Sequence, residues 1–207
     1  ALPGDRYAEA ITAAENSEVV VLCLGLDAML EGEEGDTGNE FCSGDKPDLQ
    51  LPESQRILIE KVLKVGKPTI IVLAAGSSLN PQAETADAII QAWYPGSEGG
   101  KALANILFGK VSPSAKLPVT FYEKAELLPD FQDYSMKNRT YRYAENNVLY
   151  PFGYGLTYSK VKVTKLEYSD NIAYVSVENI GDADTDEVVQ LYIKDNVSKY
   201  AVRNYNL

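Results

Sequence analysis

The first half of the chain alternates between continuous apolar runs and stretches with helical periodicity. Three runs are apolar throughout and rich in β-branched residues, at 19–26, 69–75 and 88–93. Apolar residues recur every three or four positions at 5–16, 51–65 and 97–107, and Pro81 opens a further short predicted helix. Apolar strands that alternate with helices predict a parallel sheet covered on both faces, with right-handed crossovers. Three strands are few for such a sheet, so we expect part of it to lie outside this chain.

The second half of the chain has a different pattern of apolar and polar residues. Residues 116–158 are rich in tyrosine and irregular, which predicts a linker that wraps the first domain. Apolar and polar residues then alternate with period two, at 161–166, 173–177 and 188–193. This pattern is typical of antiparallel strands with one face in water. Because three strands are too few to close a sandwich, we expect this unit to be truncated.

The predicted fold class is therefore α/β. A partial parallel-sheet domain is expected over residues 1–115, a linker over 116–158 and a truncated antiparallel β unit over 159–207.

Composition then excludes several classes of function. Thirty acidic residues against nineteen Lys and Arg give a net charge of −11, which disfavours nucleic acid and anionic membrane surfaces as partners. The chain has no histidine, which removes Ser-His-Asp and Cys-His nucleophile systems and histidine-metal sites. Acid-base chemistry must then come from carboxylates, Lys, Tyr or Cys.

The loop after the first predicted strand is the main candidate site, because ligands of parallel sheets bind at the carboxyl ends of the strands. It holds four carboxylates in six residues, Glu31, Glu33, Glu34 and Asp36. Crowded like charges disfavour ionisation, so one of these acids could stay protonated near neutral pH and act as a general acid. A solvated acidic loop is the alternative. The spacing fails the EF-hand calcium pattern, and we expect neither a metal nor a cofactor.

Seven motifs in order resemble the C-terminal half of a glycoside hydrolase family 3 β-glucosidase. Each motif alone has low specificity, but the occurrence of all seven in this order makes the resemblance specific. They are LEGEEGD (30–36), DLQLP (48–52), WYPGSEGG (93–100), GKVSPSAKLP (109–118), YRY (141–143), LYPFGYGL (149–156) and EVVQLY (187–192).

The resemblance implies an enzyme with a catalytic (β/α)8 barrel, an α/β sandwich domain and a fibronectin type III-like domain, which hydrolyses β-linked glucosides with retention. This chain would hold the later part of the sandwich and the start of the fibronectin-like unit. The family's nucleophile is an Asp of the barrel, which has no counterpart here.

The family's acid/base is a Glu supplied by the sandwich loop, and the resemblance assigns this role to Glu33. Glu31 and then Glu34 are the alternatives, because the insertion at 38–47 leaves the register open by a residue or two. Glu31, Glu34 and Asp36 are expected to keep the acid protonated or to bind sugar hydroxyls.

The expected partners are a β-glucoside or oligosaccharide substrate and the missing barrel domain, without which the isolated chain is expected to be inactive. Two alternatives stay open. One is a β-xylosidase of the same family. The other is a non-catalytic carbohydrate-binding module that would use Tyr168, Tyr174 and Tyr192.

Overall fold

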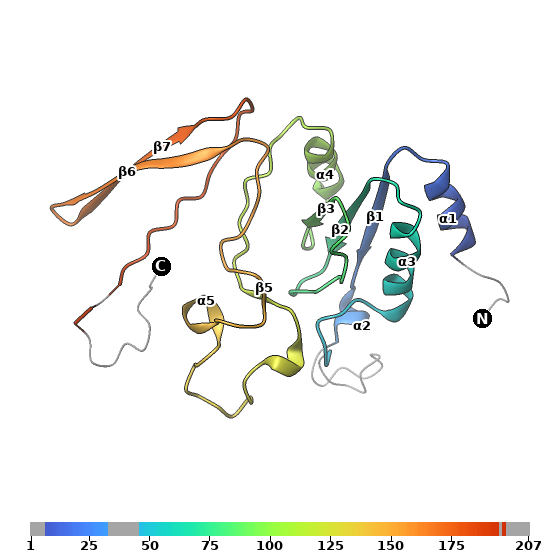
Figure 1. Cartoon of the computed structure of the whole chain (residues 1–207), viewed down its shortest axis with the longest axis horizontal. Helices are drawn as coiled ribbons and strands as arrows, with labels where there is room; N and C mark the ends of the chain where they lie inside the picture. The colour runs from blue at the N-terminus through green and yellow to red at the C-terminus, as the bar shows by residue number, and fades with distance from the viewer. Residues whose placement is uncertain (1–6, 33–45, 195, 198–207) are drawn as a thin grey trace. The chain divides into compact units, whose positions relative to one another are not determined.

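The computed structural model describes residues 7–32, 46–194 and 196–197. The chain divides into two compact units (Figure 1). Unit 1 is Ala1–Gly99 with Phe121–Leu128, and unit 2 is Gly100–Thr120 with Pro129–Leu207. No helix among the described residues is long and apolar enough to cross a bilayer. The domain boundaries expected at 115 and 158 stay a prediction.

Unit 1 is built on a parallel sheet of β1 (Val20–Gly25), β2 (Thr69–Ala74) and β3 (Ala88–Gln91), in the order β1-β2-β3. The central strand β2 is almost wholly inaccessible, with Thr69 and Ile71 both 0% exposed. A strand covered on both faces needs apolar side chains at every position, which explains its unbroken apolar run. The predicted parallel α/β architecture is confirmed.

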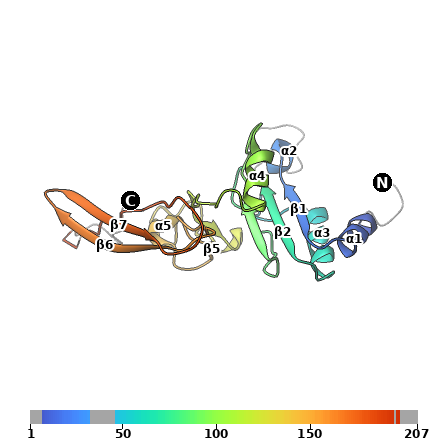
Figure 2. The same ribbon diagram turned by 90° about the horizontal axis from the view of Figure 1, so that it is seen from above.

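Two helices cover one face of this sheet (Figure 2). They are α1 (Ala8–Glu15) and α3 (Glu53–Leu63), which pack beside each other. Ile59 and Val62 turn the apolar side of α3 inward. The buried core consists of Leu26, Leu51, Ile59, Ile71, Leu73, Ala75, Leu79 and Ala83.

The helix predicted at Pro81 is wrong. The Asn80 side chain accepts a hydrogen bond from the backbone N–H of Gln82 at 2.9 Å, and Gln82 has a φ of +52°. A local side-chain acceptor and a positive φ both compete with helix formation, so the chain makes a turn here. The Asn80 N–H donates to the Leu49 carbonyl at 2.7 Å, which fixes this turn against the loop before α3.

The remaining elements are short. Helix α2 (Ala28–Glu31) was not predicted, whereas α4 (Gly99–Leu107) matches the helix predicted at 97–107. The others are β4 (Phe121–Tyr122), the 3-10 turn η1 (Ala125–Leu127), α5 (Thr140–Tyr143) and β5 (Val148–Tyr150). Within unit 1, the Trp93 and Phe121 rings meet edge-on with centroids 6.1 Å apart.

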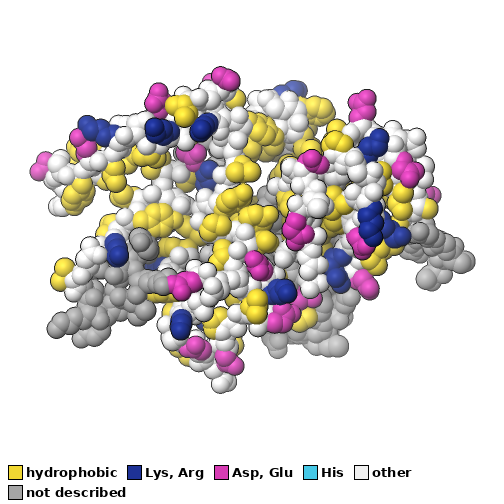
Figure 3. Space-filling model, in the orientation of Figure 1, with side chains coloured by type: hydrophobic (Ala, Val, Ile, Leu, Met, Phe, Trp, Pro, Cys, Tyr) yellow, Lys and Arg dark blue, Asp and Glu magenta, His cyan; other side chains and the backbone are white. Residues whose placement is uncertain are grey.

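Unit 2 contains an antiparallel hairpin of β6 (Val161–Ser169) and β7 (Ile172–Asn179). Asp170 and Asn171, with φ of +52° and +62°, form the two-residue connection that matches the right-handed twist of the strands. Leu166 and Tyr168 of the hairpin are 62% and 71% exposed. Figure 3 shows hydrophobic side chains at the surface of the described residues.

The third strand predicted in this unit, at 188–193, is wrong. Among the described residues, this run carries only an isolated bridge at Ile193. An alternating pattern produces a strand only where a neighbour supplies the hydrogen bonds, and here the hairpin strands pair with each other alone.

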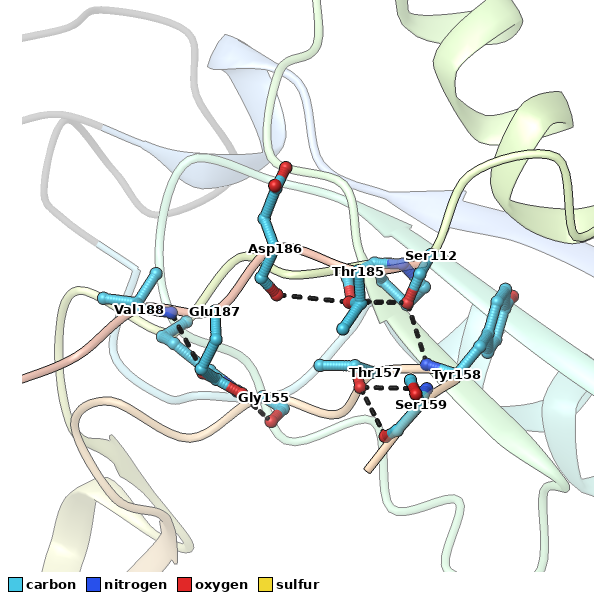
Figure 4. A network of polar contacts seen from close by, with 11 residues as sticks. Ser112, Gly155, Thr157, Tyr158, Ser159, Thr185, Asp186, Glu187 and Val188 are labelled. Atoms are coloured by element: carbon cyan, nitrogen blue, oxygen red, sulfur yellow. Dashed lines mark hydrogen bonds and ion pairs between the residues drawn. The ribbon is translucent and has the colours of Figure 1, made fainter. Parts of the chain in front are cut away.

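Polar contacts within unit 2 fix the residues directly before this run (Figure 4). Lys116 donates to the Gly155 carbonyl at 2.8 Å and forms an ion pair with Glu187 at 3.0 Å. Ser112 accepts hydrogen bonds from the Tyr158 N–H at 2.9 Å and the Thr185 hydroxyl at 3.0 Å. Three of the sequence motifs, at 109–118, 149–156 and 187–192, therefore meet at one junction.

The Lys116–Glu187 pair is expected to stabilise this junction because both side chains are largely buried, at 13% and 24% exposure. Lys116→Met removes the cation and leaves Glu187 without its charged partner, at a cost of about 1.5–3 kcal/mol. Lys165→Met is the matched control, because its ion pair with Glu167 is more than half exposed, and should cost less than about 1 kcal/mol. Urea unfolding measures both, and equal losses would contradict the prediction.

A second prediction concerns Gly25, where β1 ends. A Cβ at this position would lie 1.8 Å from the Ala74 carbonyl oxygen. The Gln55 amide also accepts from the Gly25 N–H at 3.0 Å and donates to its carbonyl at 2.8 Å. Gly25→Ala must therefore displace β1 from β2, and we expect a loss of more than about 3 kcal/mol in urea unfolding. Gly100→Ala, within a helix and with no atom near the added methyl, should be neutral or stabilising by about 0.5–1 kcal/mol.

Candidate functional site

The candidate site lies at the carboxyl ends of the three parallel strands. β1 ends at Gly25, β2 at Ala74 and β3 at Gln91, and parallel pairing brings these ends to one edge of the sheet. The segments that follow each strand must cross this edge. This is where a parallel sheet binds its ligands.

The segment after β1 is fixed by a short capped helix. The Leu26 N–H donates to the Ala74 carbonyl at 2.9 Å, which continues the pairing of β1 with β2. The Asp27 carboxylate then accepts from the N–H groups of Met29 at 3.0 Å and Leu30 at 2.9 Å, and so caps the start of α2. The helix ends at Glu31, so the first candidate residue has a defined position at the edge of the sheet.

Glu31 is held by residues that follow the other two strands. The Tyr94 hydroxyl, from the segment after β3, donates to Glu31 Oε2 at 2.6 Å. Ser77 and the backbone of Gly76, which follow β2, also hydrogen-bond the carboxylate. A Cβ at Gly76 would come within 2.8 Å of the Tyr94 ring and 3.2 Å of Glu31 Oε2, so only glycine permits this approach.

These contacts determine the ionisation of Glu31. Burial raises its pKa, but hydrogen bonds from Ser77, Tyr94 and the Gly76 backbone, with the positive charge of Lys46, outweigh burial and lower the pKa below its usual value. Burial and the neighbouring Glu31 anion raise the pKa of Tyr94. Glu31 is thus ionised at neutral pH and accepts hydrogen bonds, whereas a general acid must hold a proton.

Lys46 and Asp48 lie on the other side of residues 33–45. Lys46 is 10% exposed, forms an ion pair with the Asp48 side chain and donates to the Asp48 carbonyl at 2.6 Å. Asp48 also accepts from the Gln50 N–H at 2.9 Å. Burial raises the Asp48 pKa, but the contacts with Lys46 and Gln50 and the charge of Arg56 lower it overall. Asp48 is therefore a second fixed anion beside this segment.

Of the four acids in the candidate loop, the structure describes Glu31. Glu33, Glu34 and Asp36 lie outside the described residues. Sequence reasoning missed Tyr94, Gly76, Ser77 and Lys46 as neighbours of the loop. Tyr94 follows directly after the third predicted strand, so its position at the carboxyl edge of the parallel sheet could have been predicted from the sequence. Across the described ranges, no group of three His, Cys, Asp or Glu side chains could hold a metal ion.

The tyrosines considered for a carbohydrate-binding surface do not share one face. Tyr168 lies opposite Ala173 and Tyr174 opposite Glu167, so the two rings leave opposite faces of the hairpin. Tyr192 packs edge-on against Tyr141, with ring centroids 6.3 Å apart. Among the described residues these three therefore make no flat platform for a sugar ring.

Comparisons with known proteins agree with this architecture. Residues 4–158 match the family model described as the glycosyl hydrolase family 3 C-terminal domain. A xylan 1,4-beta-xylosidase from Xylanibacter ruminicola is 43% identical over 197 residues, which are 91% of this chain and 23% of that protein.

Two solved β-glucosidases share the fold. The structure from Erythrobacter marinus has a TM-score of 0.77 and 37% identity, and covers 96% of this chain and 27% of its own. The structure from Bifidobacterium adolescentis has a TM-score of 0.80 and 30% identity, and covers 99% of this chain and 32% of its own. The chain thus spans between about a quarter and a third of these proteins. Its relatives in these comparisons are glycosidases, and the chain belongs to glycosyl hydrolase family 3, of which it carries the C-terminal domain.

Proposed function

We propose that the chain is the C-terminal portion of a retaining β-glucosidase, and that Glu33 is the acid/base residue it contributes to an active site completed by a barrel domain. The observation that carries the proposal is the fixed position of Glu31. Glu31 lies at the carboxyl edge of the sheet, two residues before Glu33 in the sequence. Parallel α/β domains bind their ligands at this edge.

The ionised state of Glu31 supports the assignment of the acid to a neighbouring residue. Glu31 accepts hydrogen bonds from Tyr94 and Ser77, and its lowered pKa suits an anion. These contacts support the proposal that the proton donor is Glu33 and not Glu31, with Glu34 as the alternative. Glu34 and Asp36 are then the acids available to sugar hydroxyls of the leaving group.

In the first chemical step, Glu33 protonates the glycosidic oxygen while a carboxylate of the barrel attacks the anomeric carbon. The bond between that carbon and the leaving group breaks, and a glycosyl-enzyme forms. Glu33, now deprotonated, takes a proton from the water that attacks the same carbon and releases the sugar with retained configuration. The two carboxylates of such a pair lie about 5–5.5 Å apart, so the acidic segment must reach the barrel. The isolated chain, without that barrel, is expected to be inactive.

A β-xylosidase is the second candidate function, because the Xylanibacter relative is 43% identical and the Erythrobacter β-glucosidase is 37% identical. Glucosides and xylosides differ by one hydroxymethyl group on the ring. The barrel that would hold this ring lies outside the chain, so these residues favour neither sugar.

Glu33→Ala in the complete parent enzyme tests the acid role. We expect kcat/KM to fall by about 10²–10⁴-fold on a disaccharide and by far less on an aryl glycoside with a good leaving group, which needs no proton. Glu34→Ala is the matched control and should show no such selectivity. Selective loss in Glu34→Ala instead would transfer the role to Glu34.

The sugar specificity of the parent enzyme is tested by comparing its kcat/KM on an aryl β-glucoside and on the matching aryl β-xyloside. A pocket that accepts or rejects one small group discriminates by about 10–200-fold. A preference of this size for the glucoside would support the proposed β-glucosidase. The reverse preference would establish the xylosidase, and oligosaccharide binding by an enzyme-inactive parent would favour the non-catalytic module.

A further inference from the structure

We infer that Tyr94 and Glu31 are positioning residues for the general acid, and that with Gly76, Ser77 and Lys46 they form a clasp at the base of the acidic segment. The inference rests on the proposed function, because it concerns the same reaction. It assigns Glu31 a role different from substrate binding, and it gives roles to four residues that the sequence motifs alone left without one.

The clasp joins the segments that follow all three strands. Glu31 comes from the helix after β1, Gly76 and Ser77 follow β2, and Tyr94 follows β3. The Tyr94 hydroxyl also lies 3.3 Å from the Leu26 carbonyl, so it contacts both ends of the segment that carries α2. The Glu31 carboxylate is thus tied to the segments that follow the two other strands, which restricts its movement.

The backbone is shaped to make these contacts. Trp93, directly before Tyr94, has a φ of +54°, a conformation that costs free energy for a bulky residue. Its ring is held edge-on against Phe121. At Gly76 a side chain would collide with the Tyr94 ring. A strained backbone position at Trp93 and a glycine without room for a side chain thus lie beside one hydrogen bond, and backbone strain such as that at Trp93 clusters at functional positions.

Lys46 extends the clasp to the far end of the acidic segment. It is paired with Asp48, and its charge also stabilises the Glu31 carboxylate. Lys46 therefore lies near enough to Glu31 for the two opposite charges to attract each other.

Chain geometry links the clasp to catalysis. Two residues span at most about 7 Å, so a fixed Glu31 restricts where Glu33 can lie. Proton transfer requires the acid within hydrogen-bond reach of the glycosidic oxygen, and a displacement of about 1 Å can cost 10²-fold in rate. Glu31 accepts hydrogen bonds from Tyr94, Ser77 and the Gly76 backbone, which fits a role in positioning.

Tyr94→Phe in the complete parent enzyme tests the inference, because it removes one hydroxyl and keeps the ring. We expect kcat/KM to fall about tenfold or more on a disaccharide, mainly through kcat, and less than about twofold on an aryl glycoside with a good leaving group. Tyr158→Phe is the matched control: its hydroxyl donates to the Ile106 carbonyl, and both substrates should be unaffected. If Tyr94→Phe lowers kcat/KM equally on the disaccharide and on the aryl glycoside, the role of Tyr94 is purely structural and the inference is overturned.

Glu31→Ala and the double variant provide an independent check. If the two residues act as one unit, Glu31→Ala reproduces the selective loss and the double variant adds little to it. Gly76→Ala, which keeps both polar groups but displaces them, should also lose disaccharide activity selectively. Additive losses in the double variant would contradict a shared clasp.

The same substrates in Glu33→Ala separate this inference from the proposed function. Selective loss in Glu33→Ala without selective loss in Tyr94→Phe would overturn the clasp and leave the acid assignment intact. Selective loss in Tyr94→Phe without selective loss in Glu33→Ala would support the clasp and place the acid elsewhere in the segment.

Discussion

The parallel pairing of β2 with both of its neighbours is the constraint on which the rest of unit 1 depends. With β2 buried between β1 and β3, all three strands must end at the same edge, and the segments that follow them must meet there. The Gly25 backbone shows how tight this arrangement is, because it lies too close to Ala74 for any side chain. The candidate site is a consequence of this packing and not of the acidic loop alone.

The electrostatics of that edge follow from hydrogen bonding more than from burial. Burial alone would raise the pKa of Glu31, yet Ser77, Tyr94 and the Gly76 backbone stabilise the anion, and Lys46 adds a positive charge. An acidic segment can therefore contain carboxylates with different tasks. Glu31 is anchored and ionised, and in our proposal a neighbouring carboxylate carries the proton.

Unit 2 is organised by its junction and not by its hairpin. Among the described residues, the strands β6 and β7 pair only with each other, and many of their apolar side chains are exposed. Lys116, Glu187 and Ser112 instead connect three stretches far apart in sequence. Three of the four sequence motifs in this half, at 109–118, 149–156 and 187–192, thus meet in one set of contacts.

The sequence by itself determined the parallel α/β architecture, the helices at 53–63 and 99–107, the hairpin and the family, because periodicity and motif order are local properties of the chain. It failed at Pro81, where the Asn80 side chain competes with the helix, and at 188–193, where no strand among the described residues pairs with this run. Only the tertiary structure brought Tyr94 and Ser77 to Glu31. Residues 63 and 46 positions apart in the chain become neighbours through strand order, and no local pattern encodes which hydroxyl meets which carboxylate.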